Sequence, residues 1–388
     1  MTSFEQVKEK CDRYLFHNYG RQEIAFTHGK GCYLYDTEGK EYLDLVAGIA
    51  VNALGYAHPD WVAAVQAQAA RMAHVSNLYY VEQQGELAER IASIAPAGID
   101  RTLFVNSGAE ANEAALKMAV KYTGRRKIMS ALDGFHGRTS AALGATGQKK
   151  YQSGFEPLIS NAYEYFPYGD AEAVKKMITK DVAAVIVEPI QGESGVITAP
   201  AEFFKAVRDL CTDSGALMIV DEVQTGIGRT GEWYGIQNFG VVPDAITMAK
   251  ALGGGVPIGA VSSTEEFSST MTPGTHGTTF GGSPLVCTAG CATLDIMKRD
   301  RIVEHSKSLG EEWRSKIRAI PSDKIREVRG YGLMTGIEMD SPETASMCRD
   351  RGILVNVAHG KTLRLVPPLI ITSEQTDVFT DALADILS

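Results

Sequence analysis

The sequence has few cysteines, 6 in 388 residues, and they are scattered without a C-x-x-C pair. Cys287 and Cys291 have the spacing of one helical face, but no His, Asp or Glu accompanies them at the spacing of metal ligands. This pattern disfavours a disulfide framework and favours reduced thiols in the core of a cytoplasmic protein. We also predict that the chain has no metal site.

The chain lacks an apolar run long enough to cross a membrane, and its polar first stretch, Met1 to Lys10, is unlike a secretory signal. Lys and Arg number 38 against 47 Asp and Glu, so a nucleic acid is a disfavoured partner. An anionic small molecule is not disfavoured, because a single buried arginine can bind a carboxylate inside an acidic protein. We therefore expect small-molecule substrates and neither a membrane nor a nucleic acid as partner.

Apolar runs typical of buried strands alternate with helical patterns along most of the chain. They occupy residues 101–105, 127–131, 182–187, 216–220 and 245–249. Runs that are apolar on both faces and alternate with helices indicate a mainly parallel sheet covered by helices, an α/β fold.

The length suits one large domain and a smaller one. We predict an N-terminal arm at residues 1–45, with a short helix and a β-hairpin, that packs with the small domain. The large domain would span residues 46–282. Residues 283–388 would form a small α+β domain, because strand-like segments there are flanked by three helical stretches.

Two of the apolar runs end on charged residues, Asp221 and Lys250. Because ligands bind at the carboxyl ends of strands in open α/β sheets, these two side chains could share one pocket. A pyridoxal phosphate (PLP) enzyme needs this pair: the lysine forms a Schiff base and the carboxylate pairs with the pyridinium nitrogen. The alternative is a buried ion pair between two strand ends.

Three further positions are candidates for ligand contacts, each with a structural alternative. Ser107 stands between the strand at 101–105 and a helix, which is typical of an anion site but also of a plain N-cap. No G-x-G-x-x-G follows this strand, so dinucleotide binding there has no support. Phe135 could lie on a planar cofactor or in the core, and Arg138 could bind a carboxylate or a surface partner.

Six segments in order along the chain resemble the class-III, fold-type-I PLP aminotransferases. They are Asn106–Glu113, Phe135–Thr139, Glu188–Glu193, Asp221–Gly226, Ala249–Gly255 and Gly277–Gly282. The resemblance covers nearly the whole chain and implies a large domain with a mainly parallel sheet of the seven-stranded type between helices. It also implies PLP as the cofactor and decides between the alternatives for Asp221 and Lys250 in favour of the cofactor.

The resemblance assigns a role to each cofactor residue. Lys250 would be the Schiff-base lysine and, once displaced, the acid and base of the reaction, while Asp221 would keep the pyridine nitrogen protonated. Thr279 would reach the phosphate of the neighbouring subunit in a homodimer with shared active sites. Phe135 and Val223 would contact the ring of the chain's own cofactor, and Gln224 would contact the ring hydroxyl. The cofactor phosphate would be bound by Ser107, Gly108 and Ala109.

Substrate residues follow from the same resemblance. Tyr19 and Arg138 would hold the distal carboxylate of an ω-amino substrate, and Thr278 would contact it across the dimer. Arg364 would hold the α-carboxylate of glutamate or 2-oxoglutarate, and Glu193 would pair with Arg364 while the amine donor is bound. Such an exchange lets one pocket accept a neutral tail and then a carboxylate.

Within the family, the segments Gly48–Gly55 and Leu363–Pro368 are most similar to members that act on N2-acetylornithine. Ile49 stands where members acting on free ornithine resemble one another in having tyrosine, and the smaller side chain favours an acylated substrate. We expect transamination between N2-acetylornithine and 2-oxoglutarate. The alternatives are a sister ω-aminotransferase for succinylornithine, ornithine, 4-aminobutyrate or an acyl-diaminopimelate, an aminomutase-type isomerase, and a non-catalytic protein.

Overall fold

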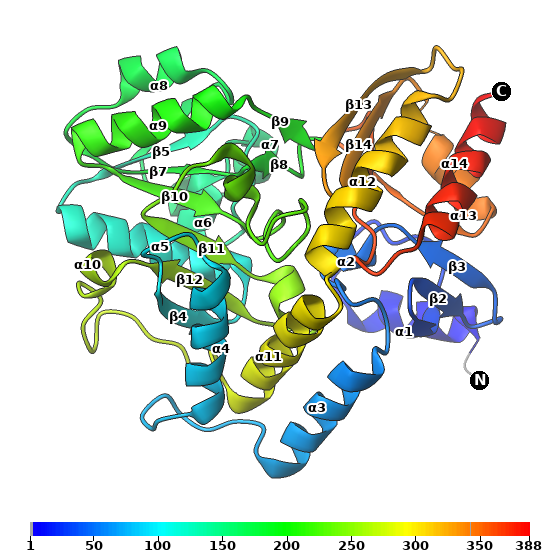
Figure 1. The fold of residues 1–388 in the computed structure, drawn as a ribbon, viewed down its shortest axis with the longest axis horizontal. Coiled ribbons are helices and arrows are strands. Elements are labelled where there is room, and N and C mark those ends of the chain that lie inside the picture. The colour runs from blue at the N-terminus through cyan, green and yellow to red at the C-terminus, as the bar shows by residue number, and fades with distance from the viewer. Residues whose placement is uncertain (1–2, 342) are drawn as a thin grey trace.

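The computed structural model describes residues 3–341 and 343–388. Figure 1 shows a large α/β part, a smaller part built on an antiparallel sheet, and an N-terminal arm beside the smaller part. Among the described residues, no helix is long and apolar enough to cross a membrane. Nor does this part of the chain hold a group of three or more His, Cys, Asp or Glu side chains that could bind a metal ion.

Seven strands of the described chain form the central sheet. Their order is β4 (Arg101–Val105), β12 (Gly259–Ser263), β11 (Ala245–Met248), β10 (Leu217–Asp221), β7 (Val182–Val187), β5 (Lys127–Ala131) and β6 (Tyr163–Phe166). β11, β10, β7, β5 and β6 pair in parallel, whereas β12 is antiparallel to both of its neighbours. The predicted mainly parallel, seven-stranded sheet is therefore confirmed.

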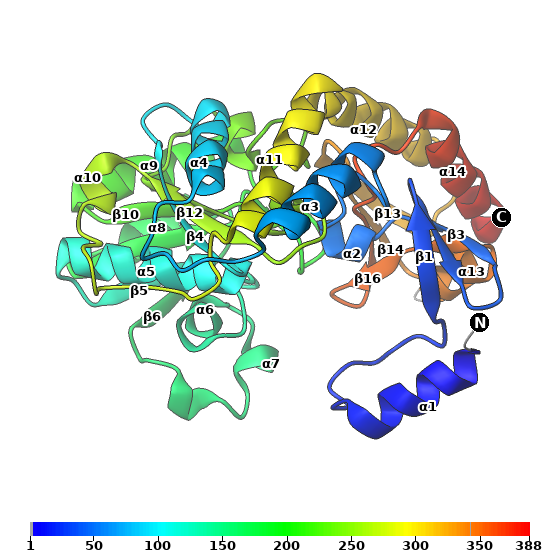
Figure 2. The ribbon, with the colours of Figure 1, turned by 90° about the horizontal axis from the view of Figure 1, so that it is seen from below.

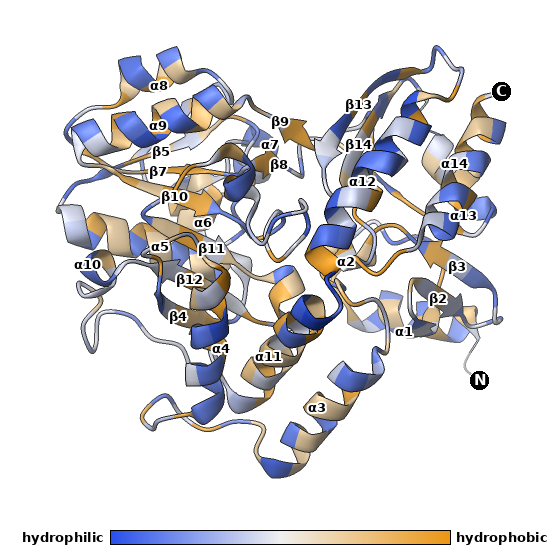
Figure 3. Ribbon diagram, in the orientation of Figure 1, coloured by the Kyte–Doolittle hydropathy of each residue, from blue (hydrophilic) through white to orange (hydrophobic). Residues whose placement is uncertain are grey.

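The strands form where the sequence can bury both faces of the backbone. Every residue of β7 is buried, and its side chains enter two different cores, Val185 in one and Ile186 in the other. Helix α5 (Gly108–Thr123) covers one face and α9 (Ala201–Ser214) covers the other. Figure 3 shows β7 and β10 coloured as hydrophobic, with hydrophilic segments along α9.

The register of the parallel strands brings the two charged strand ends together. Asp221, the last residue of β10, pairs with Thr247 of β11, and Lys250 follows two residues after β11 ends. The carboxyl ends of β10 and β11 therefore lie at one edge of the sheet, as the position of ligand sites in α/β folds requires.

The smaller part is built on an antiparallel sheet of β13 (Ile325–Tyr331), β14 (Met334–Met339), β17 (Thr362–Leu365) and β16 (Asn356–Ala358). Its helices are α12 (Ile302–Arg318), α13 (Thr344–Asp350) and α14 (Ser373–Leu387), close to the three helices that the sequence predicts. Trp313 of α12 and Phe379 of α14 are fully buried and meet edge to face, which fixes the two helices against each other.

The N-terminal arm contains α1 (Phe4–Tyr14), β1 (Phe26–Lys30) and the hairpin of β2 (Tyr33–Asp36) and β3 (Glu41–Asp44). β15 (Ile353–Leu354) pairs in parallel with β3, so the arm shares a sheet with the C-terminal part. Helix α1 buries none of its residues and projects from the body in Figure 2. The exact limits of the arm and of the two domains remain predictions.

Helix α11 (Pro284–Arg299) runs between the two parts and packs on α3 (Pro59–Arg71) and α4 (Glu82–Ile94). The shorter elements are α2 (Ala47–Ala50), α6 (Ser140–Ala145), α7 (Lys149–Gln152), η1 (Glu156–Leu158), α8 (Ala171–Met177), β8 (Ile190–Gln191), β9 (Ile197–Thr198), η2 (Gly235–Phe239), η3 (Lys250–Gly253) and α10 (Glu265–Ser268).

Two helical glycines, one in α12 and one in α4, give a matched test of how closely these helices pack on their neighbours. A Cβ atom at Gly310 of α12 would lie 1.8 Å from the carbonyl oxygen of Gly332, in the turn between β13 and β14. Gly310→Ala therefore forces the helix and this turn apart and should cost about 1–3 kcal/mol. A Cβ atom at Gly85 of α4 meets no atom within 4 Å, so Gly85→Ala should stabilise the fold by about 0.5–1 kcal/mol. Calorimetric unfolding should show midpoints that move in opposite directions, and a fall in both would contradict the packing of α4.

Candidate active site

A cavity of about 460 Å³ lies at the carboxyl edge of the central sheet. Its walls come from the turn after β4, the segment after β5, the loop after β8, the ends of β10 and β11, and residues 255–258. Most of the predicted site residues line it: Ser107, Gly108, Ala109, Phe135, Arg138, Glu193, Asp221, Val223, Gln224 and Lys250. The structure thus brings together side chains that are up to 143 positions apart between Ser107 and Lys250.

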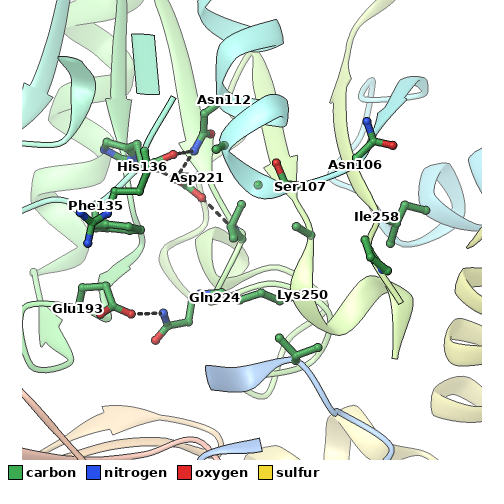
Figure 4. Close-up of a pocket in the computed structure, with 18 of the residues that line it drawn as sticks. Asn106, Ser107, Asn112, Phe135, His136, Glu193, Asp221, Gln224, Lys250 and Ile258 are labelled. Carbon is green, nitrogen blue, oxygen red and sulfur yellow. Dashed lines mark hydrogen bonds and ion pairs between the residues drawn. The ribbon is translucent and has the colours of Figure 1, made fainter. Parts of the chain in front are cut away.

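Asp221 is held by hydrogen bonds to both of its carboxylate oxygens. Its Oδ2 accepts from Asn112 Nδ2 at 2.8 Å and lies 2.7 Å from Nδ1 of His136, and its Oδ1 accepts from the Val223 amide at 3.0 Å. Asn112 is itself oriented by Thr247, whose hydroxyl donates to Asn112 Oδ1 at 2.7 Å. Figure 4 shows this network along one wall of the cavity. It satisfies both oxygens of the buried carboxylate and fixes its orientation.

The neighbours of Asp221 have shifted pKa values. Burial lowers the pKa of His136, but the hydrogen bond to Asp221 and the charges of Asp221 and Glu188 outweigh burial, so the pKa is raised overall. Burial and the charge of Asp221 raise the pKa of Glu188, whose carboxylate accepts a hydrogen bond from the Phe135 amide at 2.9 Å. The hydrogen bond between His136 and Asp221 holds the two buried side chains against each other.

Lys250 is half-buried, and burial lowers the pKa of its amine to about 8, against the opposing charge of Glu193. Within residues 3–341 and 343–388, no hydrogen bond or ion pair joins its Nζ atom to another side chain. Its backbone has a positive φ of 42°, a conformation that non-glycine residues adopt at a cost and that recurs at functional sites. The described residues therefore contain no ion pair between Lys250 and Asp221, which was the alternative interpretation of these two residues.

Ser107 is the N-cap of α5, and its hydroxyl accepts from the Glu110 amide at 3.2 Å. The free amides of the first helical turn face the cavity wall formed by Ser107, Gly108 and Ala109. A Cβ atom at Gly108 would lie 2.7 Å from the Val223 side chain, so only glycine allows this close approach. The arrangement can bind an anion through amides and the helix dipole.

Glu193, Gln224 and Arg364 form a polar cluster at the side of the cavity that faces the smaller part. Arg364 is buried on β17, and its Nη1 donates to Glu193 Oε1 at 2.6 Å and to Gln224 Oε1 at 3.3 Å. Gln224 Nε2 also donates to Glu193 at 3.3 Å. Burial raises the pKa of Glu193, but the charge of Arg364 outweighs it and the pKa is lowered. Glu193 is therefore an anion that neutralises Arg364.

Arg138 is exposed at the cavity mouth, where its guanidinium lies 4.0 Å from the centre of the Tyr151 ring and 5.6 Å from that of Phe135. Cation–π contacts of this kind hold the side chain in place and leave its N–H groups available to an anion. The Phe135 and Tyr151 rings meet edge to face, with centroids 5.6 Å apart.

Four predicted residues do not line this cavity. Arg364 reaches it only through its contacts with Glu193 and Gln224. Tyr19 is 70% exposed and lies in a separate hollow beside α1 with His17 and Arg21. Thr278 lines another hollow, with Glu110 and Glu113, and its hydroxyl accepts from Asn106 Nδ2 at 2.9 Å; Thr279 beside it is exposed. Their predicted contacts to substrate or to a partner subunit remain predictions.

The sequence interpretation missed Asn112, His136 and Glu188, which surround Asp221. Asn112 carried a signal, because it is a polar residue on a helix face that is otherwise buried and apolar, with Ala115, Leu116 and Ala119. His136 and Glu188 lie in the segments used for the resemblance, but nothing in their spacing shows that they meet Asp221.

The family described as Aminotransferase class-III matches residues 15–387. Acetylornithine aminotransferase of Methanosarcina mazei is 46% identical over 384 residues, which cover 98% of this chain and 96% of the relative. The structure of acetylornithine aminotransferase from Elizabethkingia anophelis is 32% identical with a TM-score of 0.88, covering 100% of this chain and 99% of the other. Ornithine aminotransferase from Toxoplasma gondii, whose active site is described as partly occupied by PLP, is 31% identical with a TM-score of 0.94 and coverage of 99% and 94%.

The lowered pKa of Lys250 makes a prediction for chemical labelling. Because only the neutral amine reacts, and the pKa is about 8, the reactive fraction of Lys250 should rise from about one-tenth at pH 7 to about nine-tenths at pH 9. Competitive labelling with an amine reagent, on protein freed of bound ligands and followed by peptide mapping, should give this midpoint. Exposed lysines in the same digest serve as the control, and an equal midpoint for Lys250 would show that burial does not lower its pKa.

Proposed function

Because the chain belongs to the class-III aminotransferases and is a PLP-dependent aminotransferase, we propose that its amino donor is N2-acetylornithine and its acceptor 2-oxoglutarate. The products would be N-acetylglutamate 5-semialdehyde and glutamate, in arginine biosynthesis. The observation that carries the proposal is the buried Arg364–Glu193 pair beside Lys250, which can present either a neutralised or a free cation to a substrate. Relatives that are 44–46% identical over nearly the whole chain are named acetylornithine aminotransferases, which favours the acylated donor.

The residues of the cavity fit PLP. Its phosphate would bind at Ser107 and the amides of the first turn of α5, its ring nitrogen at Asp221, and its aldehyde carbon at Lys250. Phe135 and Val223 would contact the ring, and Gln224 its hydroxyl. When bound, PLP supplies an electron sink for the electrons released as a proton leaves the substrate carbon.

The chain's own residues would then move and hold protons. Asp221, fixed by Asn112, His136 and the Val223 amide, would keep a proton on the ring nitrogen. Lys250, with a pKa of about 8, can accept a proton from the substrate carbon and return one near neutral pH.

The two substrates would use the same positively charged groups in different ways. Arg138, with Tyr19, would bind the distal carboxylate of either substrate. During the first half-reaction Glu193 neutralises Arg364, so the acetylornithine amine end meets no uncompensated charge. During the second, Glu193 releases Arg364 to bind the α-carboxylate of 2-oxoglutarate.

We further propose a cytoplasmic homodimer in which Thr278 and Thr279 reach the partner's site. The support is a group of exposed apolar side chains near the loop that carries both threonines: Leu78, Tyr79 and Tyr80 precede α4, and Phe280 follows Thr279. Asn77 Nδ2 donates to the Gly281 carbonyl at 3.0 Å, which joins these two segments. Exposed apolar groups of this size mark interaction surfaces.

A sister ω-aminotransferase is the second candidate, favoured by the TM-score of 0.94 to an ornithine aminotransferase. The aminomutase alternative has less support, because an internal amino transfer needs no exchange between Glu193 and Arg364. A non-catalytic protein would not need a lysine and an aspartate at one cavity, and both are present.

Donor specificity tests the proposal directly. The purified protein should be yellow, and N2-acetylornithine should bleach the absorbance faster than ornithine or 4-aminobutyrate in separate cuvettes. Addition of 2-oxoglutarate should restore the colour and yield glutamate. Faster bleaching by another amine would assign the enzyme to a sister activity, and a protein that stays colourless with added PLP would overturn the enzyme assignment.

Arg364→Ala tests whether Arg364 binds 2-oxoglutarate but not the amine donor. The variant should lose about 2–5 kcal/mol of binding to 2-oxoglutarate, or roughly 30- to 5,000-fold in kcat/KM for that half-reaction. The amine half-reaction should change much less, because Arg364 is already neutralised by Glu193 there. Rapid-mixing measurements of each half-reaction separate the two, and equal losses in both would show that Arg364 does not bind the α-carboxylate.

A further inference from the structure

The loop 192–196, which carries Glu193, is attached to the large part by two side chains, one just before the loop and one within it. Gln191 Nε2 donates to the Leu132 carbonyl at 2.9 Å, and the Ser194 hydroxyl donates to the Asp133 carbonyl. Beyond Glu193 the backbone takes positive φ values at Gly195 (104°) and Val196 (58°). Such a path persists only where the surroundings hold it.

Arg329 of β13 holds the far end of this loop from the smaller part. Its Nε donates to the Gly195 and Val196 carbonyls at 3.1 and 3.2 Å, and its Nη2 donates to the Gly195 carbonyl at 2.8 Å. Its charge is balanced by Glu327 at 2.6 Å and Glu338 at 2.8 Å. The Arg329 side chain is buried, so water competes little with these hydrogen bonds.

Arg329 and Arg364 lie in one row across the small sheet. Arg329 pairs with Gly336 of β14, and Gly336 pairs with Arg364 of β17. Residues directly opposite in neighbouring strands point to the same face, so both arginines face the 192–196 loop. Gly336 between them leaves room, since a Cβ atom there would lie 2.9 Å from the Gly195 carbonyl oxygen.

The loop is also packed into a small apolar cluster. Val196 is fully buried with Ile190, Ala50, Met334 and Val366, which come from both parts of the molecule. The backbone of the loop is therefore fixed by contacts that do not involve the Glu193 carboxylate.

We propose that Arg329 is a positioning residue that fixes the 192–196 backbone on the small sheet, so that only the Glu193 side chain moves when Arg364 changes partner. One arginine of the row binds the loop's carbonyls permanently, and the other binds its carboxylate reversibly. Arg329 thereby sets how strongly Glu193 competes with a substrate carboxylate for Arg364. This inference rests on the proposed exchange between Glu193 and Arg364.

Arg329→Gln removes the anchor and the charge while keeping a polar side chain. With the loop free to move, Glu193 should compete less well for Arg364, and a dicarboxylate should bind more tightly. The probe is glutarate, which has both carboxylates of 2-oxoglutarate but no reactive carbonyl. Calorimetric titration of the holoenzyme should show a dissociation constant lowered about 3- to 30-fold, the range expected for coupled members of one hydrogen-bond network.

Two controls make the result specific. Arg326→Gln changes an exposed arginine of the same strand, paired with Asp340, and should leave glutarate binding unchanged. Glu193→Gln should tighten glutarate binding by itself, and Arg329→Gln should add little to it, because Arg329 acts through Glu193. The amine half-reaction should slow relative to the 2-oxoglutarate half-reaction in Arg329→Gln, a ratio that a general loss of stability would not change.

The outcomes separate the inference from the proposed function. Tighter glutarate binding in Glu193→Gln but not in Arg329→Gln would overturn the role of Arg329 and leave the exchange intact. No tightening in Glu193→Gln would overturn the exchange and the inference with it. If Arg329→Gln does not fold, Arg329→Lys replaces it, because lysine retains the charge but cannot bond both carbonyls. This variant should lower the dissociation constant of glutarate by a smaller factor. An unchanged dissociation constant would overturn the inference.

Discussion

Keeping charged and polar side chains buried at one cavity is the constraint on which this structure depends. An isolated buried charge costs several kcal/mol, so each one must have a partner or donors in place. Asp221 has three donors, Arg364 has Glu193 and Gln224, and Lys250 reduces the problem by a pKa lowered to about 8. The close approach of Gly108 to Val223 and the positive φ at Lys250 accompany the gathering of these groups at one edge of the sheet.

The two parts of the molecule supply different halves of this arrangement. The central sheet supplies Asp221 and Lys250 at neighbouring strand ends, and the small sheet supplies Arg364 from the middle of β17. The loop 192–196 spans the gap, with its start fixed on the large part and its end bound by Arg329. In the proposed function, the groups that would discriminate between substrates come from both parts, whereas those that would hold the chain's own cofactor come from the large part. The distance between Arg364 and Glu193 therefore depends on how the two parts are held together.

Strand pattern alone predicted the central feature, because both charged residues directly follow apolar runs and parallel strands have one common edge. The same reasoning could not find β12, whose Gly-Ala-Val-Ser-Ser sequence has no apolar run, nor β6, an edge strand. It could not find His136 and Glu188 either, because their approach to Asp221 depends on how the segments after β5 and β7 fold over the strand ends. The roles of Gln224 and Arg364 rested on the resemblance, and only their mutual contact required the structure.

If Arg364 accepts both a neutral tail and a carboxylate, as we propose, it cannot gain much binding energy from either. When a substrate carboxylate arrives, one ion pair replaces another, so the electrostatic free energy gained is the difference between two similar contacts. Small changes in the placement of Glu193 then decide the balance, since the energy of an ion pair changes steeply with distance where water is scarce. This explains why so many backbone contacts fix a loop whose only functional group is one carboxylate. An accurately placed loop backbone thus matters more here than a strong ion pair between Arg364 and either partner.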